Sequence, residues 1–149
     1  MTSYVSAELR RLVESRAERT CEYCLIHESD TFLGCQVDHI VSEKHGGSTE
    51  GENLAYACTF CNQSKGTDVA SVSPMTGGLV RLFNPRTDHW ADHFSLRGNA
   101  IEPLTPIGEV TARILRLNEP ERVLERETLI GMGRYPPSQA KTRLVKGDT

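Results

Sequence analysis

The first apolar pattern along the chain predicts a helix over residues 6–19. Apolar residues recur at helical spacing on one stripe, and Ser6 precedes them as a side chain that can cap the first turn. The stripe consists of Leu9, Leu12, Val13 and Ala17. The opposite face is charged, which favours a solvated face with ion pairs between successive turns; a phosphate-contacting face is the alternative. That face carries Arg10, Arg11, Glu14, Arg16, Glu18 and Arg19.

The next stretch alternates tight turns with short regular elements. Cys21 begins a Cys-x-x-Cys turn, and the largely apolar run over residues 35–41 predicts a strand. A polar, glycine-rich segment over residues 44–52 predicts a loop. A second Cys-x-x-Cys turn occupies residues 58–61, and the segment after it is expected to form a short helix that ends near residue 70.

The second half of the chain mixes strand and helix patterns. Its start is marked by residues 73–78, Ser-Pro-Met-Thr-Gly-Gly, which indicate a boundary. The elements expected beyond it are a strand over 79–83, one or two helical turns over 88–94, a hairpin over 95–102 that turns at Gly98-Asn99, helices over 107–117 and 120–132, and a loose tail over 134–149.

Composition limits the class of protein. The 149 residues are 38% apolar and 25% charged, which indicates one folded domain, or a small domain with an appended subdomain. Mean hydropathy is -0.40, and no apolar run has the length of a membrane span. The first residues lack the pattern of a signal peptide, so we expect a reducing, cytoplasmic location. There, the five cysteines predict metal ligands or free thiols rather than disulfides.

The charge balance argues weakly against a general nucleic-acid binder. The net charge is -3 and the sequence pI is about 6.0. Residues 1–70 carry six Lys and Arg against eleven Asp and Glu, whereas residues 71–149 carry eleven against nine. A polyanion would therefore be held by locally placed Arg and Lys and by metal charge, not by a global field.

Four of the cysteines form the first strong chemical signal. The pairs Cys21/Cys24 and Cys58/Cys61 have the spacing that aims two thiolates at one point, and two such turns complete a tetrahedral site suited to structural Zn²⁺. The 33 residues between the pairs exceed a minimal zinc ribbon, so a further element is threaded between them. Coincidence or a redox pair is the alternative. Cys35 stands alone and is expected to be a buried small apolar residue.

A second set of residues lies between and beside these turns. It consists of Val37-Asp38-His39-Ile40, Gly46-Gly47, Glu52-Asn53-Leu54 and Cys58-x-x-Cys61-Asn62-x-x-Lys65-Gly66. In this order and inside a four-Cys frame, the stretch from Cys21 to about Gly66 resembles the HNH endonuclease family, the ββα-metal nucleases. The chain departs from the name-giving pattern at its third position, where Asn62 stands in place of histidine.

The resemblance implies a role for each matching residue. Asp38 would bind a metal, His39 would act as the general base that activates water, and Asn53 would pin the loop that orients the base. Asn62 would complete the metal site. Because both implied ligands offer oxygen, the catalytic metal is expected to be Mg²⁺ or Mn²⁺.

Simpler interpretations exist for single residues. Asp38 alone could accept hydrogen bonds in a turn, and Asn62 could cap a helix. Lys65 would share a helix face with Asn62, where it could touch a phosphate or be solvated. His27 and His45 are expected to be solvated. His89 and His93 have a metal-binding spacing, but the interleaved Trp90 and Phe94 favour packing.

The sequence therefore predicts an α+β fold: a small ββα-metal core with a structural zinc knuckle pair, an N-terminal helix and a mixed C-terminal extension. The expected division is residues 1–72 for the nuclease core, 73–133 for an extension packed on it and 134–149 for the tail. The expected activity is metal-dependent hydrolysis of phosphodiester bonds in DNA, with no membrane partner. Two rivals stay open: a zinc-stabilised nucleic-acid-binding module without catalysis, and a subunit or effector whose choice of target comes from a partner protein. The partners expected beside DNA are such a specificity-giving protein or a second copy of the chain in a homo-oligomer.

Overall fold

A two-stranded antiparallel hairpin forms the centre of the N-terminal half. The computed structural model describes residues 4–146; residues 1–3 and 147–149 of the sequence lie outside the described part. β1 (Cys35–His39) pairs with β2 (Leu54–Cys58) in a register that sets His39 opposite Leu54. β2 reads Leu-Ala-Tyr-Ala-Cys and is buried along its whole length. A continuous apolar strand of this kind needs cover on both faces.

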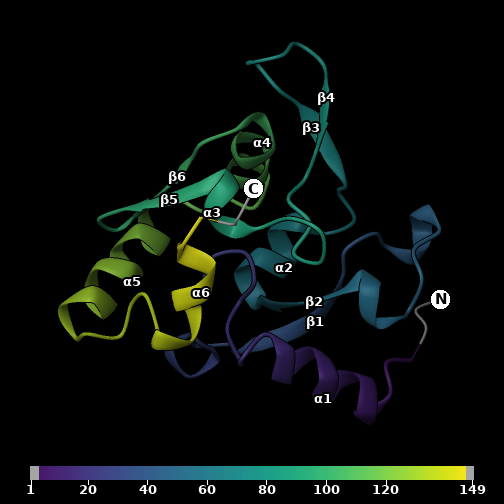
Figure 1. The fold of residues 1–149 in the computed structure, drawn as a ribbon, viewed down its shortest axis with the longest axis horizontal. Helices are drawn as coiled ribbons and strands as arrows, with labels where there is room; N and C mark the ends of the chain where they lie inside the picture. The colour runs from purple at the N-terminus through teal and green to yellow at the C-terminus, as the bar shows by residue number, and fades with distance from the viewer. Residues whose placement is uncertain (1–3, 147–149) are drawn as a thin grey trace.

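Two helices supply that cover from opposite sides. Figure 1 shows α1 (Ala7–Arg16) below the hairpin and α2 (Thr59–Lys65) above it. On the α1 side, Val13 and Ala17 pack on Leu54 and Tyr56 in a small apolar cluster of their own. Because side chains alternate along a strand, β1 presents its even-numbered residues to the α2 side, where Asp38 meets Lys65.

The structure confirms the predicted first helix and its cap, but shortens the helix. The Ser6 hydroxyl accepts a hydrogen bond from the Leu9 amide at 3.1 Å. The helix ends at Arg16 rather than at residue 19, because Glu18 and Arg19 adopt left-handed backbone angles, with φ of 52° and 56°. Short 3-10 turns fill the connections: η1 (Glu28–Asp30), η2 (Glu43–His45) and η3 (Gly51–Asn53).

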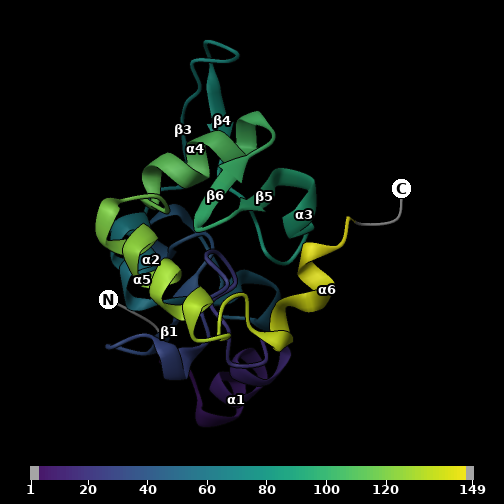
Figure 2. The ribbon, with the colours of Figure 1, turned by 90° about the vertical axis from the view of Figure 1, so that its left-hand side faces the viewer.

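The predicted boundary at residues 73–78 is the turn of a hairpin. β3 (Ala70–Val72) and β4 (Leu79–Arg81) pair antiparallel on either side of it. Figures 1 and 2 both show this hairpin projecting from the rest of the molecule. The Pro and Gly residues therefore mark a reversal of chain direction, which a sequence pattern cannot distinguish from a break between two units.

The extension contains the elements that the sequence predicts, and its apolar side chains share one core with the cysteine turns. The Trp90 indole donates to the Tyr23 carbonyl at 2.8 Å, which ties the two parts together. No helix among residues 4–146 is long and apolar enough to cross a bilayer. The elements are α3 (Trp90–His93), β5 (Phe94–Arg97), β6 (Ala100–Pro103), α4 (Pro106–Ile114) and α5 (Pro120–Gly131).

The tail differs from the loose segment that we expect from the sequence. Residues 134–146 contain η4 (Ser138–Ala140) and α6 (Lys141–Leu144). Tyr135 is 4% exposed, and its hydroxyl donates to the Cys24 carbonyl at 2.7 Å. Two helical elements this short carry no periodic pattern in the sequence. The segment is held by long-range contacts instead: buried Tyr135, the fully buried Ala140, and Arg143, which donates to the Ala17 carbonyl. Residues 147–149 of the predicted tail lie outside the described residues.

Candidate active site

The four predicted cysteines come together as one buried cluster. Their sulfur atoms lie within 4.8 Å of one another, and the sulfurs of Cys24 and Cys58 are 3.7 Å apart. A tetrahedral zinc site with Zn–S bonds of about 2.3 Å separates its sulfurs by about 3.8 Å, so the spacing suits a metal such as zinc. In each turn, the amide of the second cysteine donates to the sulfur of the first: Cys24 to Cys21, and Cys61 to Cys58, both at 3.5 Å. Cys35 lies outside the cluster.

Arg122 from α5 contacts this cluster, which the sequence does not reveal. Its Nη2 lies 3.1 Å from the sulfur of Cys61 and 3.7 Å from that of Cys58, and the residue is 6% exposed. Burial opposes the charge of this guanidinium, but the thiolates, Cys61 first, raise the pKa of Arg122 above its ordinary value. The extension therefore places a cation against the sulfurs, where it offsets the negative charge of a thiolate site.

Asp38 lies on the α2 side of β1 and is paired with a buried lysine. Its Oδ2 is 3.1 Å from the Lys65 ammonium and accepts from the Tyr23 hydroxyl at 3.3 Å. Burial raises the pKa of Asp38, and the charge of Lys65 opposes that rise. Lys65 also donates to the His39 carbonyl at 2.9 Å and is 2% exposed. The sequence suggested a phosphate contact or a solvated lysine at this position; the structure instead buries the ammonium against Asp38.

His39 ends β1 beside a polar loop. Its Nε2 lies 2.9 Å from the Thr49 hydroxyl and 4.0 Å from a carboxylate oxygen of Glu43. The side chain is 14% exposed, so solvent can reach the imidazole while the Thr49 hydroxyl contacts its Nε2 atom. Thr49 and Glu43 lie in or beside the segment that the sequence identifies only as a polar loop, and no motif marks them.

Asn53 fixes the loop that follows His39. Its side chain makes both hydrogen bonds of the Val41 backbone, accepting from the amide at 3.0 Å and donating to the carbonyl at 2.8 Å. It also donates to the Ser48 carbonyl at 2.8 Å. These three bonds hold the two ends of the loop together.

Gly47 is required by the same loop. A Cβ atom there would lie 1.7 Å from the Val41 carbonyl oxygen and 2.8 Å from the Asn53 side-chain nitrogen. Backbone atoms cannot yield as a flexible side chain can. We therefore expect Gly47→Ala to displace the loop, to lower the free energy of unfolding by about 1–3 kcal/mol and to reduce activity. Urea unfolding would measure the first effect.

Gly131→Ala is the matched control for that prediction. Gly131 closes α5, and a Cβ atom there would have no neighbouring atom within 4 Å, so the same substitution meets open space. Equal stability of the two variants would contradict the steric account of Gly47.

Asn62 is on α2, as predicted, but it does not contact Asp38 within the described residues. Its side-chain amide donates to Gln36, which lies two residues before Asp38 on the same face of β1. Where α2 packs on β1, Asn62 therefore contacts Gln36, and Lys65 contacts Asp38. Gln36 is a further oxygen-bearing side chain on this face. No sequence motif identifies it, because an isolated glutamine in a strand is not typical of any site.

His89, which precedes α3, and His93, which ends it, are engaged in packing and hydrogen bonding. The His93 ring lies edge-on to Phe83, and its Nδ1 is 2.6 Å from the Thr105 hydroxyl. His89 contacts the Val145 carbonyl instead of sharing a ligand position with His93.

Parts of the chain match a family model and a known protein. A family model described as HNH endonuclease matches residues 21–68, which run from the first cysteine turn to just beyond α2 and make up less than half of the chain. The CRISPR-associated endonuclease Cas9 of Corynebacterium diphtheriae is 33% identical over 90 residues. That alignment covers 57% of this chain and 8% of the relative, so the chain spans a small part of that protein's length. No solved structure matches.

Proposed function

Because residues 21–68 belong to the HNH endonuclease family, we propose that this chain is a metal-dependent nuclease that hydrolyses phosphodiester bonds in DNA. The relative that it resembles is named as an endonuclease, which supports a phosphodiester substrate. We further propose that the four-cysteine cluster holds a structural Zn²⁺ and that a separate Mg²⁺ or Mn²⁺ serves catalysis.

The observation that carries the proposal is the convergence of the motif on one ββα unit. Asp38 and His39 end β1, the Asn53-pinned loop follows them, and Asn62 stands on the helix packed against the same strand. Cys58 and Cys61 sit at the junction of β2 and α2, so a metal held by all four cysteines would tie that junction to the Cys21–Cys24 turn. A protein that only binds nucleic acid does not require a carboxylate, an imidazole and two side-chain amides in the order and spacing of this motif.

We assign Asp38 and Asn62 to the catalytic metal. Both offer hard oxygen ligands, and the buried Asp38 carboxylate already requires a cation, which Lys65 supplies. A divalent ion held by these residues would neutralise the phosphate and stabilise the leaving oxygen. The function of Lys65 is then to hold Asp38 ionised and in place until a metal takes over part of that contact.

We assign His39 to water activation. When the Thr49 hydroxyl accepts the Nε2 proton, the Nδ1 atom is left to take a proton from water. Asn53 keeps the adjoining loop closed, and the Lys65 bond to the His39 carbonyl fixes the backbone from the other side. The imidazole is thereby presented at the strand end with little freedom to turn.

One observation favours a second candidate, a zinc-stabilised binding module without catalysis. The two assigned metal ligands have separate partners: Asp38 is bonded to Lys65 and Asn62 to Gln36. If those pairs persisted in the presence of Mg²⁺ or Mn²⁺, the chain would bind nucleic acid without cutting it.

The test is a metal panel on supercoiled plasmid. Zinc-loaded protein freed of other ions is expected to nick or linearise the plasmid with Mg²⁺ or Mn²⁺ and to be inactive without them. Absence of cleavage with every divalent ion tried, alongside retained DNA binding, would establish the binding module instead.

Asn62→His sharpens this test. Imidazole replaces a hard oxygen ligand, so the preferred ion should move toward Ni²⁺ or Zn²⁺. Gln63→His, on the exposed neighbouring position of α2, is the control and should leave the metal profile as in the wild type. An unchanged profile for Asn62→His would remove Asn62 from the ligand set.

A further inference from the structure

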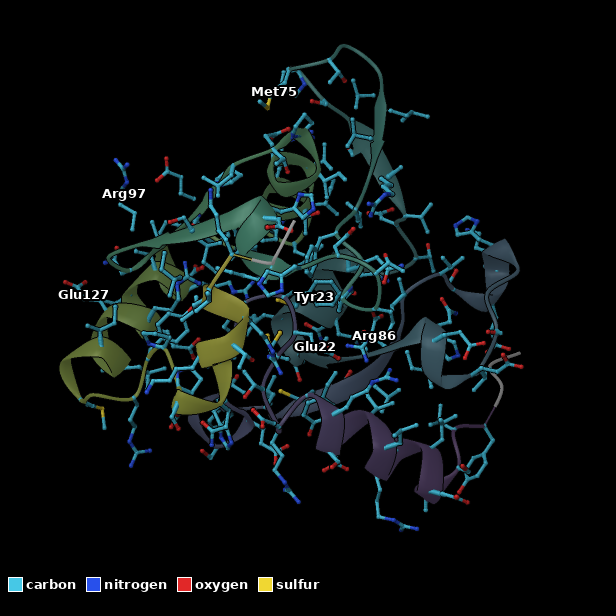
Figure 3. The ribbon with its side chains drawn as sticks, viewed as in Figure 1. Glu22, Tyr23, Met75, Arg86, Arg97 and Glu127 are labelled. Carbon is cyan, nitrogen blue, oxygen red and sulfur yellow. The ribbon has the colours of Figure 1, made fainter. Side chains whose placement is uncertain are left out.

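Three arginines from distant parts of the sequence meet beside β2. Arg16 at the end of α1 donates to the carbonyls of Gly51, at 2.6 Å, and Leu54. Arg143 of α6 donates to the Ala17 carbonyl, one residue beyond Arg16. Arg86, which follows β4, pairs with Glu22, and Figure 3 shows these two side by side near the middle of the molecule. We refer to Arg16, Arg86 and Arg143 as the arginine cluster.

Each member of the arginine cluster has a buried donor with nothing to bond. Arg16 Nε, Arg86 Nε and Arg143 Nη1 are all shielded from solvent and have no hydrogen-bond partner among residues 4–146. Buried N–H groups are nearly always paired, because an unpaired one forfeits its hydrogen bond to water. Three such donors on one cluster point to a missing acceptor.

Direct ion pairs with the cluster are also few. In the described part of the chain, its three guanidinium groups contact one carboxylate, that of Glu22, which is shared with the Tyr56 amide. Cys21 and Glu18 act on Arg143, and Glu52 acts on Arg16, as neighbouring charges without a bond to either arginine. Burial lowers the pKa of all three arginines, and repulsion from the other two helps to bring that of Arg86 to about 10.

We propose that the arginine cluster binds a phosphate oxyanion. Guanidinium groups present forked donors that match phosphate oxygens, and the three of them share one directly paired carboxylate, that of Glu22. The three residues are half-buried overall, so an anion can approach the cluster, and the shielded donors meet it when the arginine side chains turn.

The cluster borders the strand pair that carries His39. Leu54, whose carbonyl accepts from Arg16, stands directly opposite His39 in the hairpin. Resting on the proposed nuclease function, the oxyanion is a backbone phosphate of the DNA being cut, near the one under attack. Free inorganic phosphate offers the same chemistry, and the experiment below separates the two sources.

The first arm measures thermal unfolding of the full, zinc-loaded chain in inorganic phosphate and in chloride at equal ionic strength. Phosphate at about one hundred times its Kd should raise the Tm of the wild type by about 5–10 °C. Arg143→Gln should abolish that rise, and Arg143→Lys, which keeps the charge without the fork, should retain part of it. Arg97→Gln is the control, because Arg97 is an exposed arginine paired with Glu102 on the distant β5–β6 hairpin (Figure 3).

The second arm measures binding of duplex DNA in the His39→Ala background, so that no cleavage intervenes. Adding Arg143→Gln should raise Kd about 10-fold, as expected for a charge-assisted contact. It should also reduce the slope of log K against log salt concentration by about one, as expected for the loss of one phosphate contact. The Arg97→Gln addition should change neither.

The outcomes distinguish DNA phosphate from free phosphate, and both from failure of the proposal. A phosphate-specific Tm rise with unchanged DNA binding would assign the cluster to free phosphate. Equal Tm rises in the wild type and both Arg143 variants would mean an adventitious ion only and would overturn the proposal, as would flat results in both arms. Neither arm reads cleavage, so loss of the nuclease proposal in the plasmid test would be seen independently.

Discussion

Removal of the zinc that we propose for the cysteine cluster should release the C-terminal extension as well as unfold the cysteine turns. Structural zinc sites contribute folding free energy directly, and small domains built on them unfold without metal. Here the cysteines belong to the main apolar core, and Arg122 and Tyr135 of the extension both contact the cysteine turns. Burial raises the pKa of the Cys61 thiol, so without the metal that thiol takes up a proton and the buried Arg122 charge loses this negative partner.

Hydrogen exchange before and after chelation under reducing conditions would measure this coupling. We expect protection to fall across α5 and around Tyr135, together with loss of the cooperative thermal transition. Arg122→Leu should hold zinc about 10–100-fold more weakly than the wild type, the usual effect of removing a group that supports metal ligands. Cys35→Ser should keep its zinc, and loss of zinc there would mean that the ligands are misassigned. An extension that stays protected after chelation would refute the coupling.

Local chemistry accounts for the parts of the fold that the sequence predicts well. Ser6 and Thr105 each cap the helix that follows by accepting an amide hydrogen bond, and Pro120 opens α5. Gly98-Asn99 turns the β5–β6 hairpin where expected. These signals lie within a few residues of the element that they determine, so a single sequence contains all of the information.

Long-range contacts explain the differences. Tyr135 donates to the carbonyl of Cys24, 111 positions earlier in the chain, and no pattern in the tail itself predicts that partner. Arg16 resembles its exposed neighbours Arg10 and Arg11 in the sequence. It differs from them because the Gly51 and Leu54 carbonyls lie beside the end of α1.

The candidate site likewise has one part that the sequence predicts and one part that depends on long-range packing. Cysteine spacing is enough to predict the sulfur cluster, since each turn places its own two ligands. Which side chains face one another across β1 and α2 depends on how the helix packs on the strand. Lys65 therefore meets Asp38, and Gln36 meets Asn62, although the motif suggested that Asp38 and Asn62 act together.

His39→Ala should lower the rate of DNA cleavage by about 10²–10⁴-fold, the usual contribution of a positioned general base. The rest of the site should persist in this variant. His39 lies outside the cysteine cluster, so zinc content should be unchanged. The Asp38–Lys65 pair and the Asn53 bonds to Val41 do not use the imidazole, so the loop and the assigned metal ligands should stay in place.

Two further variants make the comparison specific. Thr49→Val keeps the shape of the side chain but removes the hydroxyl 2.9 Å from His39 Nε2, so it should slow cleavage by less than His39→Ala does. His27→Ala removes a histidine whose hydrogen bonds are with Ser29, and it should cleave at the wild-type rate. The measurement is the initial rate on one supercoiled plasmid at matched protein and saturating Mn²⁺. Wild-type cleavage by His39→Ala would show that another group activates the water, because a residue that takes the proton cannot be dispensable to the rate.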